Sequence, residues 1–257
     1  MTSNGTNGPR KGGQPFSTKR NGYIVSDCAA ESLKAALMLQ KEHGYPQLID
    51  DSRLKDLHRH VAPHAERKWR LCELLDQAGV FDRIMVEYSY PECTTAVLTA
   101  LSLFKQHFTN YRTRAIDQTI RKAVSFVGNS QREDGSWYGA GAICFTYATF
   151  FAVQSLEAIG EQYPNSERVR RACEFLLSKQ MDDGGWGEHW SSCDERRWIQ
   201  HERSQVVNTS WAMLALMHAG YPDSRPIQRG LELIQSRQQA NGEWLQEGIE
   251  GVFNQTW

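Results

Sequence analysis

The sequence predicts an all-α protein built from repeated helical units, arranged as an incomplete α/α barrel (toroid). Three stretches share the pattern Q-x-x-[DN]-G-x-W, and they run from Gln131 to Trp137, from Gln180 to Trp186 and from Gln238 to Trp244. Apolar residues around these stretches recur at helical spacing, whereas strand patterns are nearly absent. Self-similarity at intervals of 49 and 58 residues marks a repeat architecture, so these motifs decide the fold class.

Each repeat is interpreted as a helix that ends near the glutamine and is followed by a glycine-containing turn. The tryptophan after the turn then packs back against the helices. The similarity extends upstream, because a cation stands nine residues before each glutamine, at Lys122, Arg171 and Arg229. The repeats accordingly occupy residues 117–137, 166–186 and 224–244.

The chain before the repeats is expected to begin with an irregular tail. Residues 1–20 are polar and rich in glycine and asparagine, so we expect them to be disordered or loosely attached to a folded part at 21–257. A helix is predicted over residues 27–43, where leucine and alanine keep a helical spacing. Ser26 or Asp27 can cap its first turn.

The remaining elements are predicted to be helical as well. Residues 44–80 indicate one or two short helices, and Pro91 suits the first turn of another. Further helices are predicted at residues 113–129, 143–160, 166–180, 204–220 and 226–238. Helix pairs that recur at this interval need their neighbours to bury their apolar faces, as in a toroid or solenoid.

Composition excludes several functional classes. A chain of 257 residues with 40% apolar residues can bury a sizeable core, and a formal net charge of -1 argues against a nucleic-acid partner. No apolar stretch approaches the roughly 20 residues that span a bilayer, and the polar N-terminus does not resemble a signal peptide. Six cysteines without C-x-x-C spacing indicate reduced thiols.

A group of histidines raises the question of a metal site. His58, His60 and His64 lie close in sequence to Asp56 and Glu66. Their spacing fits no metal-ligand signature, so no metal is predicted.

Two carboxylates open the first predicted helix. Asp27 and Glu31 are four residues apart and therefore share one helix face. Taken by themselves, they are interpreted as a helix cap and a solvated side chain. A catalytic interpretation depends on the motifs that accompany them.

These carboxylates belong to a set of motifs that resembles the terpene cyclases, and specifically the oxidosqualene cyclases, the family of lanosterol synthase. That family has glutamine-tryptophan repeats and a D-C-T-A-E motif, which residues 27–31 reproduce as Asp-Cys-Ala-Ala-Glu. Other similar stretches lie at residues 10–13, 88–94, 144–147 and 249–254. The resemblance covers nearly everything from about residue 10 onward.

The resemblance implies an isomerase of sterol or triterpene biosynthesis, which cyclises 2,3-oxidosqualene to lanosterol or a protostane-type product. Asp27 would protonate the epoxide, with Glu31 behind it as a relay for reprotonation. The thiols of Cys28 and Cys93 would hydrogen-bond to the carboxyl group. This chemistry is sensible, because an apolar cavity keeps a carboxyl group protonated and hydrogen bonds to its conjugate base keep it acidic.

Aromatic side chains are the second part of the implied site. Migrating carbocations are attracted by aromatic faces, which do not attack them as nucleophiles would. The candidates are Tyr88, Tyr90, Phe145, Tyr147 and Trp211. Core packing is the alternative interpretation for each of them, and the three repeat tryptophans are assigned to structure.

The chain also departs from the family pattern. Family members contain two α/α barrels with the active site between them, and this chain corresponds to part of the second. A cation-stabilising tryptophan of the family is replaced by Gly141, and the last helix pair has no counterpart before Trp257. Alternative interpretations are therefore a truncated, non-catalytic paralogue, or half of a split enzyme completed by a separately encoded first barrel.

The resemblance further implies the setting of the reaction. Squalene-hopene cyclases protonate a plain alkene with a D-x-D-D motif, and residues 27–30 lack its extra carboxylates, which favours an epoxide. No metal or organic cofactor is implied. Family members attach to one leaflet of the endoplasmic reticulum membrane, which implies monotopic membrane association on the cytosolic side.

Overall fold

A computed structural model describes residues 26–47, 49–61, 91–139 and 142–248. These residues form helices and contain no strand, apart from an isolated bridge between Glu188 and Gln200. The chain divides into two compact units. Unit 1 comprises Met1–Trp69 and Ala96–Ala123, and unit 2 comprises Arg70–Thr95 and Val124–Trp257.

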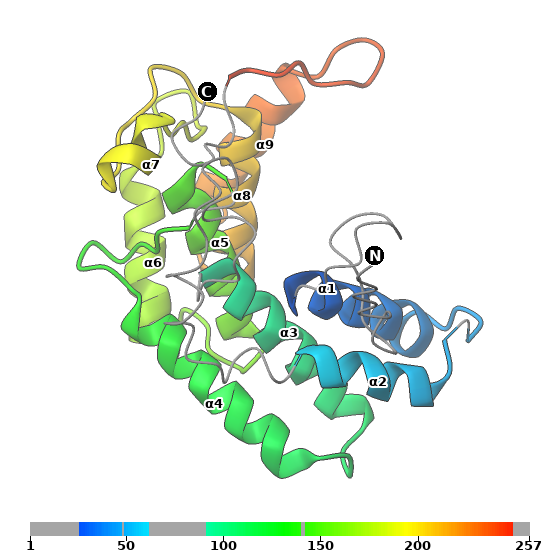
Figure 1. Cartoon of the computed structure of the whole chain (residues 1–257). Coiled ribbons are helices and arrows are strands. Elements are labelled where there is room, and N and C mark those ends of the chain that lie inside the picture. The colour runs from blue at the N-terminus through cyan, green and yellow to red at the C-terminus, as the bar shows by residue number, and fades with distance from the viewer. Residues whose placement is uncertain (1–25, 48, 62–90, 140–141, 249–257) are drawn as a thin grey trace, which may run out of the picture. The chain divides into compact units, whose positions relative to one another are not determined.

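Unit 1 is built around the packing of its first two α-helices. Its described elements are α1 (Ser26–Leu37), a short π-helix η1 (Met38–Glu42), α2 (Asp51–Val61), most of α3 (Pro91–His107) and the first part of α4 (Thr113–Asn129) (Figure 1). Leu33, Leu54 and Phe104 are fully buried in one apolar cluster. The helical spacing of leucine and alanine thus produces the core of this unit.

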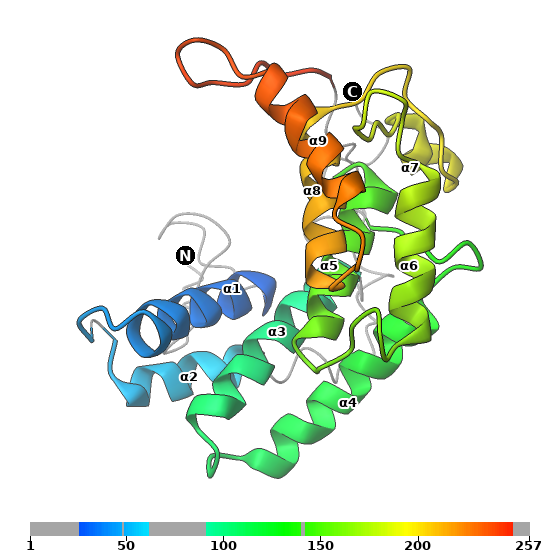
Figure 2. The ribbon, with the colours of Figure 1, turned by 180° about the vertical axis from the view of Figure 1, so that it is seen from behind.

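Unit 2 consists of two inner helices, each flanked by an outer helix. Its described elements are the first residues of α3, the end of α4, and α5 (Cys144–Glu157), α6 (Glu167–Ser178), α7 (Ser191–Glu195), α8 (Val206–His218) and α9 (Arg225–Ser236). Two views show α5 and α8 side by side, with α6 beside α5 and α9 beside α8 (Figure 1, Figure 2). Ten of the 14 residues of α5 are buried, but only two of the 12 residues of α9. α5 is therefore a core element and α9 a covering one.

The predicted helices are confirmed where the structure describes them, except that the helix expected at 27–43 is α-helical only to Leu37 and continues as the π-helix η1. Of the stretch 44–80, in which one or two short helices were expected, residues 62–80 lie outside the described residues. The helix expected at 113–129 coincides with α4, and a helix begins at Pro91 as expected. The four later predictions agree with α5, α6, α8 and α9 to within three residues at each end. The short helices η1 and α7 were not predicted individually. The expected tail at residues 1–20 lies outside the described residues.

The first two repeat tryptophans each connect the turn that contains them to the outer helix that precedes it, α4 for Trp137 and α6 for Trp186. We call residues 131–137 turn 1, residues 180–186 turn 2 and residues 238–244 turn 3. The indole nitrogens of Trp137 and Trp186 donate hydrogen bonds of 2.7 Å to carbonyl oxygens ten residues upstream, and both side chains are fully buried. The structural role predicted for these tryptophans is confirmed.

Candidate functional site

The predicted acid lies in the first turn of α1, in unit 1. Asp27 and Cys28 are both half-buried, and Asp27 Oδ1 accepts a hydrogen bond of 2.6 Å from the backbone N–H of Cys28. This local bond fixes the orientation of the carboxyl group at the helix N-terminus, where a negative charge is favoured. Glu31, one turn later, has a side chain that is 49% exposed and forms an ion pair of 2.7 Å with Lys34.

The structure describes only some of the other residues predicted for the site. Cys93 lies in the first turn of α3 and is half-buried. Its bond to Asp27 and the relay role of Glu31 remain predictions. Tyr88 and Tyr90 lie outside the described residues.

Two of the predicted aromatic residues meet in unit 2. The rings of Tyr147 on α5 and Trp211 on α8 have centroids 5.1 Å apart at 62°, an edge-to-face contact. Phe151, one turn after Tyr147, adds a second edge-to-face contact at 4.9 Å. Because all three side chains are only half-buried, this aromatic cluster keeps part of its surface accessible. Phe151 was not predicted, although its spacing of four residues from Tyr147 places it on the same helix face.

Phe145 makes its ring contacts elsewhere. It is fully buried, meets Tyr138 edge-to-face at 5.6 Å, and has the guanidinium of Arg132 5.3 Å from its ring centroid. Residues two apart on a helix point to different sides, so Phe145 and Tyr147 do not share a face. In this structure the ring of Phe145 already interacts with a cation of the protein itself.

A buried carboxylate that the sequence did not reveal holds the N-terminus of α5. Glu188 is fully buried, and its Oε1 accepts N–H bonds from Cys144 (3.2 Å) and Phe145 (3.0 Å). Its Oε2 accepts bonds from the N–H and the hydroxyl of Thr146, both 2.9 Å. Because α5 has no side-chain cap of its own, Glu188 satisfies the backbone donors of its first turn. Burial raises the pKa of Glu188, and these hydrogen bonds oppose that rise.

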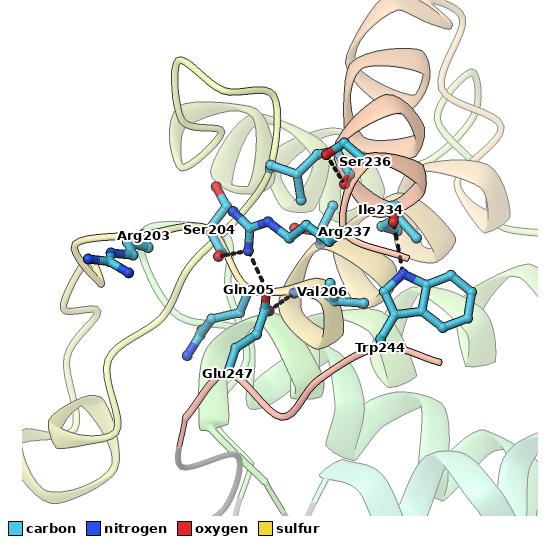
Figure 3. Close-up of polar contacts among 12 residues, drawn as sticks. Arg203, Ser204, Gln205, Val206, Ile234, Ser236, Arg237, Trp244 and Glu247 are labelled. Carbon is cyan, nitrogen blue, oxygen red and sulfur yellow. Dashed lines mark hydrogen bonds and ion pairs between the residues drawn. The ribbon is translucent and has the colours of Figure 1, made fainter. Parts of the chain in front are cut away.

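The same arrangement recurs at α8. Glu247 Oε2 accepts the N–H of Val206, the first residue of α8, and Glu247 Oε1 pairs with Arg237 (Figure 3). Both carboxylates follow a repeat tryptophan closely, at two residues after Trp186 and three after Trp244. An ionisable residue just after the tryptophan is therefore the sequence signal that could have revealed Glu188.

Two cysteines without a predicted role also meet near the start of α5. The sulfurs of Cys144 and Cys193 are 2.9 Å apart, and both cysteines are free thiols. Burial raises the pKa of Cys144 well above that of an ordinary thiol. The hydrogen bond with Cys193 is the second cause and acts in the same direction. Cys144 therefore stays a neutral thiol at physiological pH.

The described residues contain neither a cluster of three or more ligands that could hold a metal ion nor a helix long and apolar enough to cross a membrane. Of the three histidines considered as ligands, His58, in unit 1, is buried against Phe104 and lacks a polar partner within the described part of the chain. The side chain of His60 and the whole of His64 lie outside the described part. What the described residues offer chemically is an acid at a helix N-terminus and an aromatic cluster.

Comparison with known proteins places these features in a family context. Residues 72–255 match the family described as squalene-hopene cyclase C-terminal domain. The chain is 52% identical to lanosterol synthase erg7A of Aspergillus fumigatus, over 96% of this chain and 34% of that protein. It is 50% identical to lanosterol synthase of Pneumocystis carinii, over 95% of this chain and 36% of that protein. The chain thus spans about a third of the length of these relatives.

A solved structure supports the fold. The type II terpene cyclase MstE from Scytonema superimposes with a TM-score of 0.61 at 13% identity, covering 96% of this chain and 64% of that chain. At this identity the likeness concerns the fold alone.

Proposed function

Because the chain belongs to the squalene-hopene cyclase C-terminal domain family, we propose that it is the acid-bearing part of an oxidosqualene cyclase. The reaction would be the cyclisation of 2,3-oxidosqualene to lanosterol or a protostane-type triterpene. The observation that carries the proposal is the identity of about half of all residues with proteins named lanosterol synthase, across nearly the whole chain. Residues 27–31 supply the matching acid motif.

In the proposed mechanism Asp27 transfers its proton to the epoxide oxygen. The C–O bond then opens, the hydroxyl forms, and the resulting carbocation is attacked by the alkenes of the folded substrate in turn. Loss of a proton from the last cation completes an isomerisation, so no cofactor is consumed. The bond from Cys28 N–H to Asp27 Oδ1 supports this role, because it orients the carboxyl group and stabilises its conjugate base.

The remaining groups complete the proposal. Cys28 and Cys93 would donate thiol hydrogen bonds to Asp27, and Glu31 would relay a proton back to it. The intermediate cations would face aromatic rings, for which the contact between Tyr147 and Trp211 gives the best support among the described residues. The other candidates for this role are Phe145, Tyr88 and Tyr90. Monotopic association with the cytosolic side of the endoplasmic reticulum membrane is part of the same proposal.

A second candidate function is favoured by the extent of the match. The chain spans about a third of its relatives, and an acid without an enclosed cavity is open to water, which quenches carbocations. By this interpretation the chain is a non-catalytic paralogue. The proposed function instead requires a first barrel, in the same polypeptide or separately encoded, to enclose the substrate.

One assay distinguishes these possibilities. Purified chain is incubated with 2,3-oxidosqualene in detergent micelles, alone and with the part of the Aspergillus fumigatus relative that precedes its matched stretch, and cyclised products are measured by gas chromatography with mass spectrometry. We expect product only in the mixture, and none with Asp27→Asn. Asp51→Asn, at the first turn of α2, is the matched control and retains activity. Absence of product in both samples supports the non-catalytic paralogue.

A further inference from the structure

Cys144 and Cys193 are two thiols that come from distant parts of unit 2 and meet side by side. Cys144 is the first residue of α5, and Cys193 lies in α7, 49 residues later in the chain. Their sulfurs are 2.9 Å apart, so a movement of about 1 Å would bring them to the roughly 2 Å of a disulfide bond. Both are free thiols in this structure, and the proposed cyclisation uses neither of them.

The backbone on both sides of this contact is held in place by hydrogen bonds. The hydroxyl of Tyr138 donates to the carbonyl oxygen of Cys193 at 2.9 Å. Arg132, in turn 1, donates to the carbonyl oxygen of Arg196 at 3.1 Å. The N–H of Cys144 donates to the buried carboxylate that caps α5, at 3.2 Å. The two sulfurs therefore meet because the segments that carry them are positioned by other contacts.

The two thiols differ in their access to solvent. Cys144 is fully buried, whereas Cys193 is only half-buried, so a small oxidant reaches Cys193 first. Burial raises the pKa of Cys144, which keeps this thiol protonated and slows its direct oxidation, because the thiolate is the reactive form. An accessible cysteine beside a shielded one is the arrangement of a redox-sensitive thiol with its resolving partner.

A third thiol of unit 2 provides the comparison. Cys173, on α6, is 1% exposed, and burial raises its pKa to about 12. Unlike Cys144, it forms no hydrogen bond to another cysteine within the described part of the chain. Cys173 therefore shares the burial of Cys144 without the adjacent sulfur, which makes it the internal control.

We propose that Cys144 and Cys193 form a redox modification site, at which a hydroperoxide such as hydrogen peroxide converts the two thiols to a disulfide. The sulfur of Cys193 attacks the peroxide, the O–O bond breaks, and the thiol proton leaves with the departing hydroxide as water. The sulfur of Cys144 then attacks the resulting sulfenic acid of Cys193, an S–S bond forms, and the Cys144 proton leaves with the second hydroxide as water. The two sulfurs lose two electrons and the peroxide gains them. A dithiol reductant reverses the reaction.

The disulfide would join α7 covalently to the start of α5. α7 is a helix of only five residues, and so short a helix has little stability of its own. The bond would hold α7 against α5 and suppress its local opening. This consequence holds whether or not the protein is a cyclase.

The test is a disulfide map of the full chain after exposure to hydrogen peroxide. Reduced protein is treated with peroxide, the remaining thiols are alkylated with iodoacetamide, and the monomer band of a non-reducing gel is digested with trypsin for mass spectrometry. Trypsin releases Cys144 in peptide 133–168 and Cys193 in peptide 180–196, each with a single cysteine. We expect these two peptides to be joined, with two hydrogens fewer than their sum, and to be separated by dithiothreitol.

Matched variants assign a role to each sulfur. Cys193→Ser should abolish the joined peptides and leave Cys144 unoxidised. Cys144→Ser should let the sulfenic acid of Cys193 persist, so that its labelling by dimedone rises several-fold. Cys173→Ser should leave the yield of joined peptides unchanged. Circular dichroism checks that each variant is folded, and Cys144→Ala replaces the serine variant if serine unfolds the protein.

Hydrogen exchange measures the expected effect on α7. The amides of residues 191–196 should exchange about tenfold more slowly in the oxidised chain than in the reduced chain, because local opening is suppressed. Peroxide should leave their exchange unchanged in Cys193→Ser.

Three results would overturn the proposal. One is the absence of joined peptides, with Cys193 either unmodified or oxidised only to the sulfinic acid. Another is the joining of Cys173 to either cysteine in the same yield, which would mean that disulfides form in the unfolded chain. The third is equal exchange of α7 in the oxidised and reduced chains, which would show that the bond does not anchor this helix.

Discussion

Glu188 and His58 are both buried ionisable side chains, but the protein surrounds them in opposite ways. Glu188, in unit 2, accepts four hydrogen bonds from the first turn of α5. His58, in unit 1, is 1% exposed, stacks on Phe104 at 4.9 Å, and has no partner for either ring nitrogen among the described residues. Burial alone therefore does not define the role of an ionisable group. Glu188 organises a helix, whereas His58 is tolerated as a neutral aromatic ring.

The largest change in stability is expected from removal of the Glu188 carboxylate. Glu188→Ala leaves the N–H groups of Cys144, Phe145 and Thr146 buried without acceptors, so we expect a loss of roughly 4 kcal/mol in the free energy of unfolding. Urea denaturation followed by circular dichroism measures it. Glu195→Ala, at an exposed position of α7, is the control and should change stability by less than about 0.5 kcal/mol. A loss below about 1 kcal/mol would show that water replaces the carboxylate.

The second test is acidification, which acts on His58. Burial, helped by the charges of Arg112 and Arg59, lowers the pKa of His58 from 6.5 to about 4. A lowered histidine pKa contributes full stability above pH 6.5, and this contribution is lost as the pH falls from 6.5 towards 4. The loss attributable to His58 should reach roughly 2 kcal/mol at pH 5 and about 3 kcal/mol below pH 4.

The control for acidification is a chain without the imidazole. Other groups also titrate in this range, so the quantity to compare is the change in unfolding free energy between pH 7 and pH 5 in the original chain and in His58→Leu. The variant should lose less stability than the original chain by the amount attributed to His58. Equal losses would mean that the ring is protonated without cost, and therefore that it is hydrated.

A smaller effect is expected when Glu188 keeps its shape but loses its charge. Glu188→Gln retains one oxygen acceptor but turns an NH₂ group towards backbone N–H donors. We expect a loss of roughly 2 kcal/mol, between those of the original chain and the alanine variant. The same urea titration orders the three proteins. A glutamine variant as unstable as the alanine variant would show that the two oxygens act only together.

The smallest effect should come from replacing His58 at neutral pH. His58→Phe keeps the aromatic ring against Phe104 and Tyr111 and removes two nitrogens that lack partners within the described residues. We expect a change of less than about 1 kcal/mol at pH 7, in either direction. A loss of several kcal/mol would instead reveal a polar partner for the ring, and would make His58 resemble Glu188.

The sequence was sufficient for the repeats and for the helices between them, because their signals are local. Residues 113–129 were predicted as a helix, and α4 has these bounds. Apolar spacing, a proline and the glycine turns each act within a few residues. The place of Glu188 just after Trp186 is a local signal as well, but its role could not be predicted, because the N–H groups that it binds lie 42 to 44 residues earlier in the chain.

The candidate site was predicted less completely than the fold. The contact between Tyr147 and Trp211 brings together two residues that the resemblance had indicated. Phe145 was chosen by the same motif, yet its ring contacts Tyr138 and Arg132. A motif names residue types in order along the chain, but the direction of each side chain depends on the helix face and on the neighbours it meets.

The hydrogen bonds of Glu188 also affect how unit 2 unfolds. Repeat proteins commonly fray from an end, because each repeat touches only its neighbours. Here Glu188, just after turn 2, accepts hydrogen bonds from the first turn of α5, so we expect these two segments to open together. Glu247, just after turn 3, accepts only one N–H of α8, and Trp244 in that turn is 42% exposed. The amides of turn 3 should therefore exchange with deuterium before those of turn 2.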